Sequence, residues 1–142
     1  MKPFEYFIET QEIKNGIKDI ALARSLVKDM LSRIKDVLSL DINKLPKLIF
    51  ENIYDALRDF ADAVLAIDGF KSYSHQASFA YLSKYNFEET ILDTFDRFRY
   101  KRNGSKYYGQ GISIEEAKEI LEFYKRNKDK INDILKNKNL ID

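Results

Sequence analysis

Apolar residues recur at intervals of three, four and seven along most of this chain of 142 residues. That spacing places them on one face of an α-helix. The chain has only five Gly and two Pro, whereas turn-rich all-β folds use many more of both. No segment shows the alternation of a half-buried strand. The pattern therefore predicts an all-α protein, an up-and-down bundle of four main helices plus a short extra helix, in one domain over residues 1–142.

The apolar spacing and the breaks between periodic segments give the expected helices. Pro46 suits a first helical turn, and Gly69 suits a helix end at positive φ. Two pairs have the spacing of capping boxes: Asn86 with Glu89, and Ser113 with Glu116. The main helices are expected over about 13–39, 46–67, 86–103 and 113–137, the short one over about 74–84, and residues 1–12 as a short helix or an arm on the body.

The first long helix is expected to bury one line of side chains. Arg24 falls on the same line, where it would snorkel or form a buried ion pair. The apolar members of the line are Ile17, Ile20, Val27, Leu31, Ile34 and Leu38.

The helix over 46–67 is expected at the centre of the bundle, because it has two apolar seams. Its remaining face carries four acids, Glu51, Asp55, Asp59 and Asp62. This acidic stripe is either a solvated face or a docking surface for something basic, in this chain or in another.

Composition excludes several classes of site. The chain has no Cys and a single His, His75, so it has no disulfide and no zinc site of the Cys/His type. We expect no metal and no cofactor. No apolar run reaches the roughly 18 residues of a membrane span. The first residues carry an acid early and lack the apolar stretch of a signal peptide, so we expect a cytoplasmic protein without membrane contact.

The segment 97–108 concentrates positive charge in a protein whose net charge is only +1. It holds five cations and no acid. Helical spacing puts Arg99, Arg102, Asn103 and Lys106 on one face, as an extension of an apolar seam. Arg binds phosphate through two parallel hydrogen bonds, and interleaved aromatic rings can stack on unpaired bases. The segment therefore indicates RNA or a nucleotide as ligand, or else a basic helix end paired with the acidic stripe.

Four stretches together resemble the HEPN family (higher eukaryotes and prokaryotes nucleotide-binding). The segment that ends in Tyr-Tyr-Gly is the most specific of them, and the resemblance covers roughly residues 13–137. The stretches are 52–58, 61–70, Ser74-His75 and 97–109. The resemblance implies a helical bundle, often a homodimer, and in many members a metal-independent ribonuclease encoded with a nucleotidyltransferase as a toxin–antitoxin pair.

The family signature is an Arg followed, after four to six residues, by a His. Arg102 matches the Arg, and Asn103 matches the polar residue that commonly follows it. Tyr107 or Tyr108 stands at the His position. A Tyr hydroxyl titrates near pH 10 and is a poor base at pH 7, so the change favours binding over cleavage.

Three functions stay open from the sequence. The first is an RNA- or nucleotide-binding bundle with phosphate contacts from Arg99, Arg102, Asn103, Lys106 and Tyr108. The second is a non-catalytic interaction module for a nucleotidyltransferase, to which Tyr107 or Tyr108 could offer a nucleotidyl acceptor. The third is an active endoribonuclease that uses Arg102 with Tyr107 or Tyr108. His75, near a helix start, is expected to pack or to cap the helix.

Overall fold

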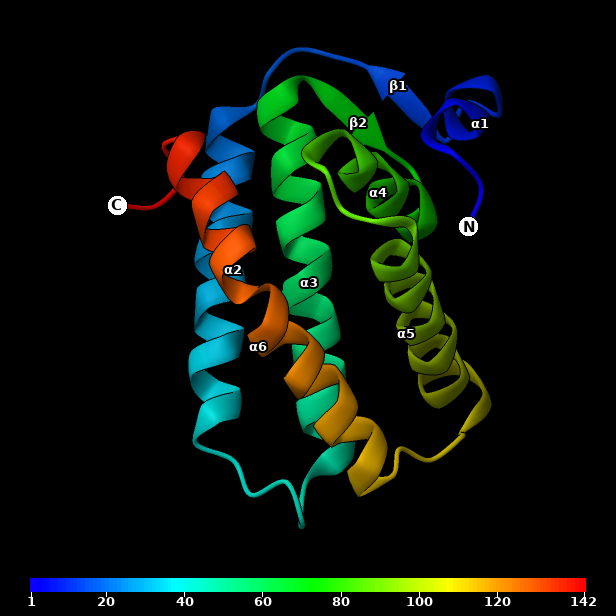
Figure 1. Cartoon of the computed structure of the whole chain (residues 1–142), viewed down its shortest axis with the longest axis vertical. Helices are drawn as coiled ribbons and strands as arrows, with labels where there is room; N and C mark the ends of the chain where they lie inside the picture. The colour runs from blue at the N-terminus through cyan, green and yellow to red at the C-terminus, as the bar shows by residue number, and fades with distance from the viewer.

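Four long helices form the body of the protein in the computed structural model, which describes all residues 1–142 (Figure 1). They confirm the all-α bundle with a short extra helix. In chain order the elements are α1 (Phe4–Glu9), β1 (Ile13–Asn15), α2 (Ile20–Leu38), α3 (Pro46–Asp68), β2 (Phe70–Ser72), α4 (His75–Tyr81), the 3-10 turn η1 (Leu82–Tyr85), α5 (Glu89–Tyr108) and α6 (Ile114–Asn137). None of these helices is long and apolar enough to span a membrane.

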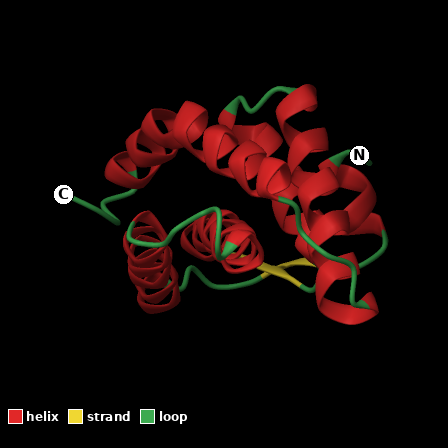
Figure 2. Cartoon of the chain, turned by 90° about the horizontal axis from the view of Figure 1, so that it is seen from below, coloured by secondary structure: helices red, strands yellow, loops and turns green.

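Helix α3 is the centre of the bundle, as its two apolar seams predict. It contacts α2, α4, α5 and α6. Figure 2 shows α2 and α3 nearly end-on, with α6 crossing over them. Twelve residues of α3 are buried, more than in any other helix. Pro46 is in its first turn, and Gly69 ends it at φ 86°. Helix α3 therefore provides the surface against which the other helices pack.

The start of α2 differs from the prediction. Residues 13–15 form β1, which pairs antiparallel with β2 so that Ile13 faces Ser72. The helix begins only at Ile20, after Asp19, whose carboxylate accepts a hydrogen bond from the Leu22 amide at 2.9 Å. Strands of three residues are too short to show an alternating pattern. Their pairing depends on the turn after α3, where the Gly16 amide donates to the Gly69 carbonyl at 2.7 Å.

The buried face of α2 was also predicted only in part. Val27 and Ile34 are buried as expected, but Ile20, Leu31 and Leu38 are exposed, and Ile17 lies outside the helix. The residues that face α3 beside them are Ala23, Met30 and Val37. Arg24 is exposed and forms no ion pair. The helix carries apolar residues on two adjoining lines, and contact with α3 selects one of them.

Helix α5 begins later and ends later than predicted. Asn86 does not cap it, because that residue adopts φ 62° and ends the preceding turn. At the other end α5 continues through Gly104 to Tyr108 and is ended by Gly109 at φ 67°. A Cβ at Gly104 would overlap the side chain of Gln110, which folds back over the helix. Gln110 is exposed and its side-chain end can move, so this glycine is an interior residue of α5 and not a helix end.

The capping box predicted at the start of α6 is confirmed. The Ser113 hydroxyl accepts from the Glu116 amide at 3.1 Å, and the Glu116 carboxylate accepts from the Ser113 amide at 2.9 Å. Within residues 1–12, Phe4–Glu9 form the short helix α1, which buries Phe4 and Phe7 and contacts α4, where the Phe4 ring lies 4.9 Å from that of Tyr81.

Candidate functional site

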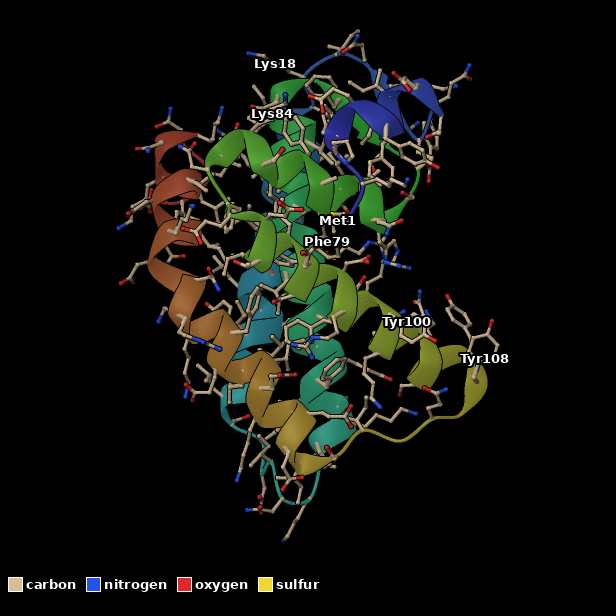
Figure 3. The ribbon with its side chains drawn as sticks, turned by 45° about the vertical axis from the view of Figure 1, so that its right-hand side comes forward. Met1, Lys18, Phe79, Lys84, Tyr100 and Tyr108 are labelled. Atoms are coloured by element: carbon tan, nitrogen blue, oxygen red, sulfur yellow. The ribbon has the colours of Figure 1, made fainter.

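The C-terminal part of α5 projects from the bundle, and Figure 3 shows Tyr100 and Tyr108 pointing away from the body there. Because an α-helix turns 100° per residue, this segment has an inner face toward α3 and an outer face toward solvent. The residues predicted for the site divide between these two faces.

Four of the five cations of the segment form ion pairs with acids of the same chain. Lys106 is the exception, and its Nζ lies 5.4 Å from the centre of the Tyr107 ring. The pairs are Arg97 with Glu119 at 2.8 Å, Arg99 with Asp96 at 2.8 Å, Lys101 with Glu116 at 2.8 Å, and Arg102 with Asp55 at 3.1 Å. The expected positive patch is thus largely neutralised, mostly by acids of α3 and α6.

Arg102 belongs to the inner face and is buried, with only 8% of its surface exposed. Its guanidinium pairs with Asp55 and lies 5.7 Å from the centre of the Tyr54 ring. Its Nε is out of contact with solvent and has no hydrogen-bond acceptor. Arg102 therefore joins α5 to α3, in addition to any role toward a ligand.

The acidic stripe of α3 is a docking surface within this chain. Asp59 pairs with Arg33 of α2 at 3.1 Å, and Asp55 lies 3.7 Å from the same arginine. The two remaining acids of the stripe have partners as well: Glu51 accepts from the Ser105 hydroxyl at 3.4 Å, and Asp62 lies 3.4 Å from Arg58. Burial raises the pKa of Asp59 to about 6, against the opposing effect of Arg33.

His75 packs against Tyr54, and the N-cap of α4 is Ser74 instead. The His75 Nδ1 lies 2.9 Å from the Tyr54 hydroxyl. Burial, and then the charges of Arg58, Arg102 and Arg99, lower the pKa of His75 to about 4, so the ring is neutral at pH 7. Burial also raises the pKa of Tyr54. The phenol thus keeps its proton and donates it to Nδ1, its only hydrogen-bond partner, which leaves the ring proton on Nε2.

The pKa shifts of His75 and Asp59 predict opposite slopes in the pH dependence of the free energy of unfolding. His75 titrates near 6.5 when unfolded and about 4 when folded, so its contribution to the free energy of unfolding rises with pH across this window. Asp59 titrates near 3.8 when unfolded and about 6 when folded, so its contribution falls with pH. In the wild type the two contributions oppose each other.

Replacing either His75 or Asp59 should change the slope of the free energy of unfolding against pH. As the pH rises from 4 to 6, the free energy of unfolding of His75→Phe should fall by about 1–2 kcal/mol relative to that of the wild type, after allowance for solvent screening. Asp59→Asn should gain a similar amount over the same range. Urea denaturation at a series of pH values measures both. Two variants that keep the wild-type profile would contradict the assignment.

The outer face of α5 gathers aromatic side chains. Tyr100, Tyr107 and Tyr108 are 75%, 64% and 80% exposed. Together with Asn103 and Gln110 they line a pocket of about 270 Å³. Lys106 is exposed beside it. Of the six predicted site residues, Lys106, Tyr107 and Tyr108 are therefore exposed, and Asn103 is half-buried in this pocket.

The two members of the predicted catalytic pair do not meet in one chain. Arg102 faces α3, whereas Tyr107 lies five positions on, roughly 140° around the helix, and is exposed. Arg99 is half-buried beside Asp96, which also accepts from Gln76 at 3.1 Å. The predicted phosphate contacts are thus split between two sides of α5.

Sequence reasoning passed over Tyr54 and Arg58 as functional residues, because Tyr54 belongs to an apolar seam. A signal was present in their spacing: Tyr54, Arg58 and Asp62 follow each other at intervals of four, which places them in one row along α3. That row lies against His75, which sequence distance could not show.

Comparison of the chain with models of protein families, with curated proteins and with solved structures finds no match. The geometry of the site is therefore the basis for assigning a function.

Proposed function

We propose that this chain is a HEPN-like protein that binds RNA or a nucleotide through the outer face of the C-terminal part of α5. The observation that carries the proposal is the group of three exposed tyrosines around the pocket at Asn103. Exposed aromatic rings on a projecting helix are platforms on which unpaired bases stack, at about 1–3 kcal/mol per base. Lys106, the one cation of the segment without an acidic partner, supplies the phosphate contact.

The inner face supports this surface from behind. Arg102 holds α5 against α3 through Asp55, and Arg99 is fixed by Asp96. Both guanidinium groups are paired with acids, which leaves Lys106 as the unpaired positive charge of the segment. Their main role in this proposal is to fix the helix that presents the tyrosines.

RNA binding should depend on the outer face. In fluorescence anisotropy with a labelled single-stranded RNA, replacing both Tyr107 and Tyr108 with Ala should weaken affinity at least tenfold, given about 1–3 kcal/mol for each stacked base. Lys106→Gln should make the slope of log affinity against log salt shallower by about 0.7. The fold should be unaffected, because all three side chains are exposed.

Tyr73→Ala is the matched control. Tyr73 is also an exposed tyrosine near positive charge, because the Nζ atoms of Lys14 and Lys71 lie 5.6 and 5.5 Å from the centre of its ring, but it lies outside α5. Affinity should be unchanged in this variant. An equal loss in Tyr73→Ala, or no loss in the double variant, would show that RNA does not use the outer face.

A nucleotidyltransferase encoded as a toxin–antitoxin partner is part of the proposal, with both proteins in the cytoplasm. Such an enzyme could reach the exposed phenols of Tyr107 and Tyr108, which lie next to Lys106 in the sequence. In this proposal the chain forms a homodimer through the projecting end of α5.

Cleavage of RNA by Arg102 with Tyr107 would need that homodimer. The two residues face different sides of one α5, so only a second copy could bring its Tyr107 to the Arg102 of the first. Binding without turnover is therefore the function that the geometry of a single chain supports best.

A further inference from the structure

A second cleft, of about 380 Å³, lies among α2, α3, β2 and the start of α4. It contains no residue of α5, so it is separate from the proposed RNA site. One wall is apolar and is formed by Leu22, Leu26, Leu65 and Phe70. Its volume lies in the range of small-molecule sites, about 300–1,000 Å³.

Arg58 supplies the cleft with unused hydrogen-bond donors. Its Nε is out of contact with solvent and makes no hydrogen bond. The Asp62 carboxylate lies 3.4 Å from this nitrogen, without hydrogen-bond geometry. None of the hydrogen bonds in the structure involves the Arg58 guanidinium. The Arg58 side chain as a whole is 40% exposed, so its terminal N–H groups remain open to an oxyanion ligand.

His75 adds a second donor of a defined kind. It lines the same cleft, and its Nδ1 is occupied by the Tyr54 hydroxyl. Because Tyr54 donates that hydrogen bond, the proton of the neutral ring is on Nε2, which has no partner within the chain. Arg58 and His75 thus both offer N–H groups to an oxygen acceptor.

The charge of the cleft selects among oxyanions. Arg58 and Lys71 are positive, Asp62 is negative and His75 is neutral, which leaves a net charge of one positive unit. A carboxylate carries one negative charge, whereas a phosphate monoester carries nearly two at neutral pH. We propose that this cleft binds a monocarboxylic acid with an apolar body, whose carboxylate meets Arg58 and His75 and whose body lies against Leu22, Leu26 and Phe70.

Phenylpropanoate is a suitable probe, with its neutral amide phenylpropanamide and the dianion phenyl phosphate as matched comparisons. Titration of the 15N-labelled protein, followed by NMR, should shift the amide signals of the cleft with phenylpropanoate. Phenylpropanamide should bind at least tenfold more weakly than phenylpropanoate, as expected for the loss of a charge-assisted hydrogen bond. Phenyl phosphate should also bind more weakly than the carboxylate.

Arg58→Gln should weaken phenylpropanoate binding at least tenfold. Arg126→Gln removes the same charge from an exposed position on α6 and should leave binding unchanged. The amide spectrum of each variant shows whether it is folded, and Arg58→Lys, which keeps the charge, should retain part of the affinity. The proposal is overturned if phenylpropanoate shifts no NMR signal of the cleft, or if phenylpropanamide binds as tightly as phenylpropanoate. It is also overturned if phenyl phosphate binds more tightly than phenylpropanoate, or if Arg126→Gln and Arg58→Gln have the same affinity for phenylpropanoate.

Discussion

Replacing Arg102 with Ala should lower the free energy of unfolding by about 3 kcal/mol. The substitution leaves Asp55 without its closest cation and opens a space over the Tyr54 ring. Removing one partner of a buried ion pair costs about 3–5 kcal/mol, because the other charge stays behind uncompensated. The lower end of the range is expected here, since Arg33 still lies 3.7 Å from Asp55.

Urea denaturation of Arg102→Ala beside Arg126→Ala measures this effect. Arg126 is exposed and forms no ion pair, so its removal should change stability by no more than about 0.5 kcal/mol. The Asp55→Asn single and double variants complete a cycle in which the two losses should not add. Equal stability of the two Arg variants would mean that the ion pair does not hold α5 in place.

This stability effect changes how binding data must be interpreted. A loss of RNA affinity in Arg102→Ala would report the position of α5 as much as a lost phosphate contact. The exposed residues Lys106, Tyr107 and Tyr108 are better tests of the surface, because their substitution leaves the inner face intact.

Replacing Phe95 with Ala should cost about 3–5 kcal/mol of unfolding free energy, the range for a fully buried Phe. The Phe95 ring lies 4.8 Å from that of Phe79 in α4, 6.2 Å from Phe87 and 5.1 Å from Phe123 in α6, measured between ring centres. It is 1% exposed. The substitution leaves a cavity where α4, α5 and α6 meet, so α5 loses its main anchor.

Tyr100→Ala is the control for this prediction, because it removes an aromatic ring from the same helix. Tyr100 is 75% exposed, and its substitution should change stability by no more than about 0.5 kcal/mol. Thermal or urea denaturation of both variants gives the comparison. A Phe95→Ala variant as stable as Tyr100→Ala would contradict the packing described here.

Local patterns in the sequence were sufficient for the class of fold. The period of apolar residues gave α3 and α6 nearly to their ends, and Gly69 and the Ser113 box mark helix ends because capping depends on residues within one turn. The same local reasoning failed at Asn86, where the spacing of a capping box was present but the backbone is left-handed. Spacing alone does not fix a backbone conformation.

The sequence predicted the charged residues of the candidate site but not the residues with which they pair. The cations of α5 were found as a group, but their partners lie on other helices: Asp55 is 47 positions from Arg102, and Glu119 is 22 from Arg97. An acid-free segment in the sequence is therefore not an acid-free surface in space. The cleft at Arg58 and His75 was missed for the same reason, since α2, α3, β2 and α4 each supply part of it.

The sequence by itself determined that this protein is a helical bundle with α3 at its centre, because helical periodicity and helix ends are set by neighbours along the chain. Only the tertiary structure decided which line of α2 is buried, that β1 pairs with β2, and that Arg102 turns inward while Tyr107 and Tyr108 turn outward. Those outcomes depend on contacts between segments distant in the chain, and their energies have no counterpart in local spacing.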